Sequence, residues 1–238
     1  RSTRKESSAA SDVYKRQIQI LIKDVDVLVV GGGTAGFGAA VAAGRKGFKV
    51  MLIEATSKVG GVMAFCPGMP WGAAYPKDQI VGGLLGELTH HLESMIPPAA
   101  EKRSCSLENF GPEIIYDHDI ATLTMFTMLE QANVDVRLNS TAIEPVMFGS
   151  KITRVRCCDR NGIFYVKPRF VLDCSGDGDI SAKAGVPFTV GDNNGNTMGV
   201  TCSFHMINVD WNQAFAGDDP YFTSYAAKGI AAVSYTHL

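Results

Sequence analysis

Three glycines and one glutamate have the types and the spacing of a dinucleotide phosphate site. Gly31, Gly33 and Gly36 occupy the glycine positions of G-x-G-x-x-G, and Glu54 follows Gly36 by about 18 residues. The first glycine permits a tight turn, the second lets the backbone approach a pyrophosphate, and the third lets a helix pack closely on a strand. Glu54 would accept hydrogen bonds from both hydroxyls of an adenosine ribose, and its charge would repel a 2′-phosphate.

These residues need a strand, a helix and a second strand to position them. Residues 25–30 are almost wholly apolar and predict a strand buried on both faces of a parallel sheet. Small residues over 34–46 predict a helix whose first N–H groups, those of Thr34 and Ala35 included, would face a phosphate. Residues 49–53 predict the second strand, which completes a right-handed βαβ unit. A tight strand-to-helix turn without a ligand is the alternative, and this context disfavours it.

The segments after this unit differ from those of a simple NAD domain. Residues 55–76 are rich in glycine and small apolar residues, and they predict a long ligand-lining loop. Helical stretches follow at 82–95 and 119–133, separated by a polar connection that contains three prolines. Residues 134–138 predict a third sheet strand.

A β-meander is predicted next, with short strands over 141–148, 151–159 and 162–168. The dipeptide Asn161-Gly162 is a strong hairpin turn signal between the last two strands. From residue 169 to 185 the opening pattern is repeated: a buried strand, a turn of glycine and aspartate, and a helix that Asp179 would cap.

The order of these motifs resembles the FAD-dependent oxidoreductases of the glutathione-reductase-type fold. The similar features are the glycine fingerprint with its strand-end acid, "VGG" at 59–61, the meander, and "DCSGDGDISAKAGVP" at 173–187. The chain is most similar to the branch related to fumarate reductase flavoproteins, in which DATGDGD-x-A-x-x-AG-x-P is typical. The resemblance covers about residues 24–210, and it implies FAD as the cofactor.

The resemblance also implies further cofactor contacts. Gly60 and Gly61 would lie beside the pyrophosphate and flavin, although they could be turn glycines without contact. Asp177, after Gly176, could accept a hydrogen bond from a ribityl hydroxyl, and the backbone of Ala142 would contact adenine. The candidate cofactor-binding residues are Gly31, Gly33, Thr34, Ala35, Gly36, Glu54, Gly60, Gly61, Ala142, Gly176 and Asp177.

Catalytic residues are not identified by the sequence. Cys66 could be a redox thiol near the flavin, but a buried structural thiol is favoured because no Cys-x-x-Cys partner is present. His205, in an alternating stretch, could act as an acid, although a packed or surface histidine is the commoner case. Residues 55–70 contain no histidine, so FAD would be held without a covalent bond. His90 and His91 are expected on the surface of an amphipathic helix.

Composition excludes several classes of function. The net charge is −2, and no Lys/Arg cluster remains once the basic leader is set aside, so a nucleic-acid partner has no electrostatic support. The six cysteines show no clustering with histidine, which favours reduced thiols, a cytoplasmic location and no metal site. Cys157 and Cys158 are adjacent on a predicted strand and would face opposite sides. No apolar run reaches the roughly 18 residues of a membrane span.

The two ends of the chain resemble the translated adapter of a sequencing-library transposase. One set of codons for "DVYKRQ", residues 12–17, extends on the opposite strand through "VSYTHL", residues 233–238. We therefore expect residues 1–17 and 233–238 to be non-native. The expected domains are an incomplete FAD-binding domain over 18–185 and the start of a substrate domain over 186–232.

The predicted fold class is α/β: a three-layer, Rossmann-like FAD-binding domain with a parallel sheet and a β-meander, followed by a truncated second domain. The predicted function is an FAD-dependent oxidoreductase that acts on a small-molecule substrate, with its oligomeric state open. Three alternatives remain: an NAD(P)-dependent dehydrogenase, a flavin-fold protein without net redox chemistry, and a thiol-linked flavoenzyme that acts through Cys66.

Overall fold

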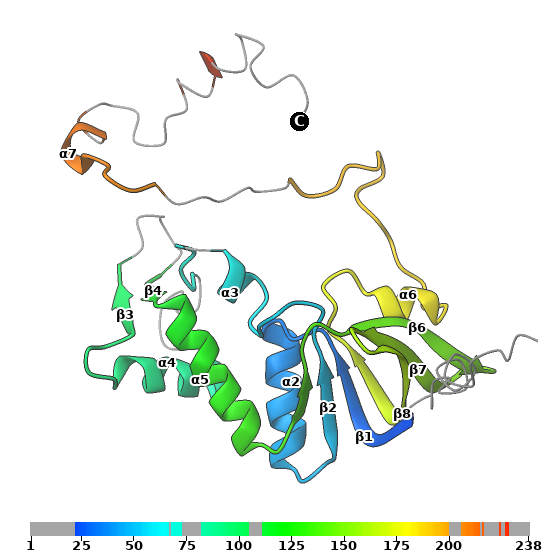
Figure 1. Ribbon diagram of the computed structural model, residues 1–238. Coiled ribbons are helices and arrows are strands. Elements are labelled where there is room, and N and C mark those ends of the chain that lie inside the picture. The colour runs from blue at the N-terminus through cyan, green and yellow to red at the C-terminus, as the bar shows by residue number, and fades with distance from the viewer. Residues whose placement is uncertain are drawn as a thin grey trace, which may run out of the picture. The chain divides into compact units, whose positions relative to one another are not determined.

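A computed structural model describes residues 22–66, 68–72, 82–104, 111–199, 206–214, 216, 224 and 227–228. The chain divides into two compact units, residues 1–200 and 201–238. In chain order the elements are β1 (Ile22–Val30), α2 (Thr34–Arg45), β2 (Val50–Ile53), α3 (Val62–Phe65), α4 (Gly83–Glu93), β3 (Ala100–Arg103), β4 (Glu113–Tyr116), α5 (His118–Gln131), β5 (Asp135–Arg137), β6 (Thr141–Phe148), β7 (Lys151–Asp159), β8 (Gly162–Asp173), α6 (Asp179–Lys183) and α7 (Trp211–Ala214) (Figure 1).

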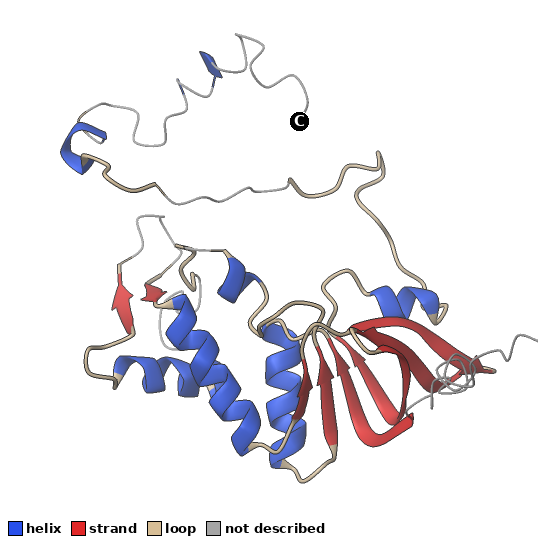
Figure 2. Cartoon of the chain, in the orientation of Figure 1, coloured by secondary structure: helices blue, strands red, loops and turns tan. Residues whose placement is uncertain are grey.

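The first unit is built on a six-stranded sheet with the order β5-β2-β1-β8-β7-β6. Figure 2 shows the strands of this sheet in red and the helices in blue. The strands from β5 to β8 pair in parallel, and β8, β7 and β6 pair antiparallel. The predicted α/β class, with a parallel sheet and a meander, is therefore confirmed.

Helices α2 and α5 cover one face of the sheet. Val29 and Leu52 from the strands pack in one apolar cluster with Ala40 of α2 and Met125 of α5, and all four side chains are essentially inaccessible to water. The predicted strand, helix and second strand all form, with ends within three residues of those expected. Local propensity and burial agree here, so the pattern identified the elements well.

The meander and α6 cover the other face. Leu28 and Ile53 form a second buried cluster with Val155 of β7, Val166 of β8 and Ile180 of α6. The layers are thus helices, parallel sheet, and meander with α6, as expected for the three-layer arrangement.

The meander and the central sheet share one strand, which differs from the prediction. Proline 168 was expected to separate a meander strand from a new buried strand, but β8 continues through it from Gly162 to Asp173. The continuation is also not fully buried, because Phe170 is 62% and Leu172 39% exposed. Pro168 is tolerated because the pairs of β8 with β7 end at Val166, so that at position 168 β8 is paired only with β1, where Val25 lies opposite.

The polar connection between α4 and α5 contains a ribbon that the sequence did not predict. Strands β3 and β4 pair antiparallel, with Ala100 opposite Tyr116, and Trp71 pairs with Ile114 on the other side of β4. Only Ala100 of β3 is buried. Its three charged residues give no strand signal, because pairing rather than side-chain pattern forms this element.

The meander turns follow the prediction closely. The loop Gly149–Ser150 joins Phe148 to Lys151, but the second hairpin closes one residue earlier than expected, since Asp159 pairs with Gly162 itself. The first of the two adjacent cysteines, Cys157, is fully buried, and burial raises its pKa to about 12.

The second unit contains helix α7, where the Gln213 N–H donates to Asp210 Oδ1 at 3.1 Å. His205 lies outside the described residues. Within the part of the chain that the structure describes, no helix combines the length and the apolar character of a membrane span.

Candidate functional site

The carboxyl ends of β1, β2 and β8 meet at one edge of the sheet, and the Gly31 turn lies there. The Gly31 N–H donates to the Ile53 carbonyl at 2.8 Å, and the Cys174 N–H donates to the Val30 carbonyl at 2.7 Å. Gly31 has φ +94°, and a Cβ on it would lie 2.2 Å from the Cys174 carbonyl oxygen. Only glycine fits this turn, because both the backbone angle and the neighbouring strand exclude a side chain.

The N-terminus of α2 is open toward this edge. Gly33 is its N-cap and has no side chain to accept from the helix, and the first turn holds no acid. The first intrahelical bond is donated by the Phe37 N–H to the Gly33 carbonyl, so the N–H groups of Thr34, Ala35 and Gly36 have no acceptor within the helix. Thr34 and Ala35 are exposed. This end of the helix can therefore bind an anion.

Gly36 brings α2 against the turn. A Cβ at this position would lie 1.8 Å from the Gly31 carbonyl oxygen. The absence of a side chain at Gly36 therefore allows α2 to lie this close to the end of β1.

Glu54 ties the end of β2 to the glycine turn. Its side chain is 92% buried, with 8% exposure. Oε2 accepts from the Gly32 N–H at 2.6 Å, and Oε1 accepts from the N–H and the hydroxyl of Thr56, each at 2.7 Å. The Thr56 hydroxyl also lies 2.9 Å from the Lys58 carbonyl, and one proton can serve only one acceptor. If that proton turns to Lys58, the carboxylate keeps about two acceptor positions for a ligand.

Gly60 and Gly61 pack directly on the α2 end of the turn. The Gly60 N–H donates to the Gly32 carbonyl at 2.8 Å, and Gly60 bridges to Gly33 in parallel. A Cβ on Gly61 would lie 3.0 Å from the Gly33 Cα. Both have positive φ, so the two glycine turns are in contact through backbone alone.

The turn after β8 lies beside Gly31, but its helix is capped differently from the prediction. Asp179 is the first residue of α6 and caps nothing, since the N-cap is Gly178 in the left-handed region. Asp173 Oδ2 accepts from the Ser181 N–H at 2.6 Å, and the Ser175 hydroxyl accepts from the Asp179 N–H at 3.0 Å.

Asp173 therefore organises this turn. Burial alone would raise its pKa, but hydrogen bonds from Ser181 and Ser175 outweigh that effect and lower the pKa. Gly176, with φ +93°, and Asp177 are exposed at the tip of the turn. Their groups are available to a ligand at the sheet edge.

Ala142 lies on β6, which begins close to Glu54. The Ser140 N–H donates to the Glu54 carbonyl at 3.0 Å, and Ala142, two residues on, pairs with Cys157. The structure thus brings the candidate residues of the two glycine turns and Glu54 together, with Ala142 near Glu54 and the turn of Gly176 and Asp177 after β8.

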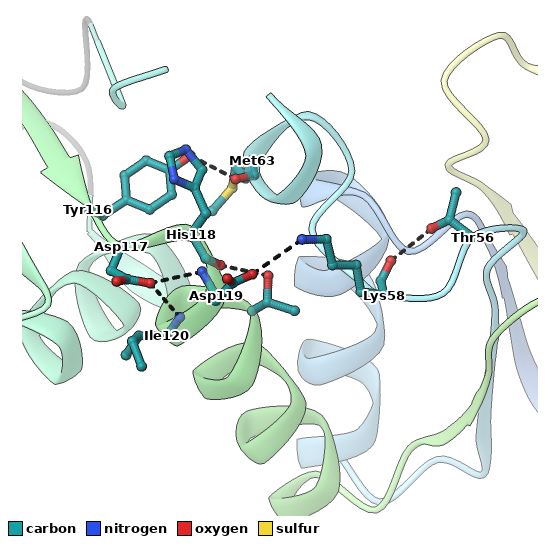
Figure 3. A network of polar contacts seen from close by, with 9 residues as sticks. Thr56, Lys58, Met63, Tyr116, Asp117, His118, Asp119 and Ile120 are labelled. Atoms are coloured by element: carbon teal, nitrogen blue, oxygen red, sulfur yellow. Dashed lines mark hydrogen bonds and ion pairs between the residues drawn. The ribbon is translucent and has the colours of Figure 1, made fainter. Parts of the chain in front are cut away.

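An aromatic cluster lies beyond Gly61. The Tyr116 hydroxyl donates to the Met63 carbonyl of α3 at 3.1 Å, and Lys58 pairs with Asp119 at 3.4 Å (Figure 3). Trp71 stacks on Tyr116 with ring centroids 4.3 Å apart. Cys66, at the end of α3, is partly rather than fully buried.

The remaining candidates give no further site. His90 and His91 are exposed on α4, as expected. Among the described residues, no three potential ligands of the His, Cys, Asp and Glu types come together as a metal site.

Two residues of the site were missed by the sequence reasoning. Gly32 supplies the N–H that Glu54 accepts, and only the fingerprint glycines on either side of it were considered. Asp173 holds the second turn, and its signal was present, since it is an acid at the end of a predicted strand, as Glu54 is.

Comparisons with known proteins are consistent with this geometry. A family model described as "FAD dependent oxidoreductase" matches residues 26–235. The chain is 27% identical over 215 residues to a digeranylgeranylglycerophospholipid reductase of Picrophilus torridus, covering 86% of this chain and 51% of that protein. It is 26% identical to the protein of the same name from Thermoplasma acidophilum, covering 88% and 52%. The chain therefore spans about half the length of these curated relatives.

A solved structure shows the same fold. The anhydrotetracycline hydroxylase OxyS from Streptomyces rimosus superposes with a TM-score of 0.53 at 16% identity, covering 71% of this chain and 35% of that one.

Proposed function

Because the chain belongs to the FAD-dependent oxidoreductase family, we propose that its glycine-rich sheet edge holds FAD without a covalent bond and that the whole protein is a reductase of an organic small molecule. Family membership makes FAD the cofactor, which argues against the alternative of an NAD(P)-dependent dehydrogenase that uses the same glycine turn. Bound FAD supplies hydride or electron transfer.

The observation that carries this proposal is the backbone cradle at the sheet edge. At Gly31 and Gly36, a Cβ would lie 2.2 Å or less from a carbonyl oxygen, and the N–H groups of Thr34 and Ala35 point out of an uncapped helix end. A pyrophosphate fits such a cradle, because it needs close backbone approach and N–H donors rather than side chains.

Glu54 would hold the adenosine ribose. Its fixed carboxylate has room for about two further hydrogen bonds when the Thr56 hydroxyl donates to the Lys58 carbonyl. We place adenine beside the backbone of Ala142, two residues after the Ser140 contact with Glu54.

The remaining candidates would bind the other half of the cofactor. Gly60 and Gly61 are proposed to flank the pyrophosphate, because they contact the Gly33 backbone. Gly176 and Asp177 are proposed to face the ribityl chain, since their turn adjoins Gly31 and exposes its groups.

Reduction is the proposed direction of the reaction. The two curated relatives are named reductases, and the motif over residues 173–187 supports a place in the glutathione-reductase-type fold near the fumarate reductase flavoproteins. We propose residues 18–185 as the FAD-binding domain and 186–232 as the start of the substrate domain, with residues 1–17 and 233–238 non-native.

The decisive experiment is the visible spectrum of the purified protein before and after denaturation. We expect flavin absorption bands at about 370 and 450 nm. On denaturation the flavin should pass into the low-molecular-weight filtrate. A colourless protein that cannot be reconstituted with FAD would refute the proposal. Cys66→Ser should keep both flavin and activity, and loss of activity with the flavin retained would favour the thiol-linked alternative.

A further inference from the structure

The phenol of Tyr116 is joined to the segment that follows the second glycine turn. Its hydroxyl donates to the Met63 carbonyl at 3.1 Å in a buried bond that spans 53 positions of sequence (Figure 3). Tyr116 ends β4 and directly precedes Asp117, the N-cap of α5. The bond therefore connects the cofactor-side segment, residues 60–66, to the helical layer.

Residues 60–66 have little rigidity of their own. Helix α3 within them has four residues, and so short a helix is unstable in isolation. Among the described residues, the backbone bonds of α3 are local, such as that from the Met63 N–H to the Gly60 carbonyl at 3.1 Å, and at the start of the segment the Gly60 N–H also reaches the Gly32 carbonyl at 2.8 Å. Val62 and Phe65 are 58% and 47% exposed, whereas Met63 and Ala64 are buried. The position of α3 therefore depends on contacts such as that of Tyr116.

Tyr116 is itself held firmly. Trp71 stacks on it at 4.3 Å with an interplanar angle of 27°, and His118 lies 4.7 Å away on a tilted ring. Two backbone hydrogen bonds, of 2.9 and 3.1 Å, join Trp71 to Ile114 of β4. Burial raises the pKa of Tyr116, so its hydroxyl stays protonated and can donate at neutral pH.

We infer that Tyr116 is a positioning residue for the cofactor site: through the Met63 carbonyl it fixes residues 60–66, and with them the Gly60–Gly61 turn that packs on Gly33. This inference rests on the proposed function, in which that turn flanks the FAD pyrophosphate. A site whose backbone is fixed before binding loses less conformational freedom when the ligand arrives. Tyr116 thus raises FAD affinity without touching the cofactor.

The test compares Tyr116→Phe with the matched control Tyr165→Phe. Tyr165 is a partly exposed tyrosine of β8 in the meander. Phenylalanine at position 116 keeps the ring that stacks on Trp71 and removes the hydroxyl that donates to Met63. Hydrogen exchange of the FAD-free protein should become faster in residues 60–66 of the Tyr116 variant, with α2 unchanged. The Kd for FAD should rise roughly three- to tenfold, the worth of one hydrogen bond, while Tyr165→Phe changes neither quantity.

A failure of the Tyr116 inference can be distinguished from a failure of the proposed function. Equal exchange rates and equal FAD affinity in Tyr116→Phe and the wild type would overturn the inference. A wild-type protein that binds no FAD would instead refute the proposed function. The exchange data would then still decide whether Tyr116 fixes residues 60–66.

Discussion

Adding one methyl group at Gly36 should damage the site, whereas adding it two residues later should not. A Cβ at position 36 would lie 1.8 Å from the Gly31 carbonyl oxygen, although real Cβ atoms almost never approach a heavy atom within 3.0 Å. Helix α2 must therefore move away from β1 by about 1 Å or more. At Gly38, in the same helix, an added Cβ would meet nothing within 4 Å.

The two substitutions should change stability in opposite directions. Overpacking at Gly36→Ala should cost about 1–3 kcal/mol, while Gly38→Ala should gain about 0.5–1 kcal/mol because alanine is the better helix former. The displaced helix end would also lose one good N–H bond to the pyrophosphate. A charged hydrogen bond is worth about 1.5–3 kcal/mol, so the Kd for FAD should rise by roughly 10- to 150-fold in Gly36→Ala alone.

Urea unfolding gives the stabilities, and quenching of flavin fluorescence gives the affinities. The reasoning is refuted if Gly36→Ala binds FAD within twofold of the wild type at unchanged stability. It is equally refuted if Gly38→Ala loses as much affinity as Gly36→Ala, since the effect would then not come from the contact with Gly31.

Three further perturbations test separate contacts. Asp173→Asn should lower stability by about 1–3 kcal/mol in urea unfolding at pH 7, and Asp179→Asn, its control, should change little because Asp179 caps nothing. Since the pKa of Asp173 is lowered in the folded state, its contribution is present above its ordinary 3.8 and is lost as pH falls through the folded value; an equal acid response in Asp173→Asn would contradict this. Burial raises the pKa of Cys157 from 9.0 to about 12. The protonated thiol therefore contributes fully to the free energy of unfolding below pH 9, and this contribution is lost as pH rises toward 12. Between pH 8 and 10 the free energy of unfolding of the wild type should therefore fall by about 1.4 kcal/mol more than that of Cys157→Ala. Glu54→Gln places an amide against two backbone N–H donors, so FAD affinity measured by titration should fall at least about tenfold, and an unchanged Kd would exclude the ribose role.

The sequence predicted the parts of the fold in which local pattern and tertiary position agree. The pattern of apolar residues predicts three elements from their own sequences: the strand before Gly31, the helix after it and the strand before Glu54. The meander was predictable from its turns, because Gly149 lies in the first and Gly162 directly follows the second.

The parts that failed depend on partners remote in sequence. The ribbon of β3 and β4 has no apolar alternation, and Pro168 stops a strand only when its missing N–H is needed. Asp179 has the right type for a cap, but Asp173 already accepts from the Ser181 N–H that a cap at position 179 would use. The Tyr116 contact spans 53 positions, and no local signal announces it.

The junction where Gly33 meets Gly60 and Gly61 consists of main chain alone, and this limits how evolution can act on it. At Gly60 and Gly61 substitution is disfavoured, because both have positive φ and an added Cβ would lie 3.0 Å or less from a neighbouring atom, whereas at Gly33 an added Cβ would meet only the Gly61 Cα, at 3.9 Å. Side chains that mutation can exchange lie instead at Glu54 and at the exposed tip of the Asp177 turn.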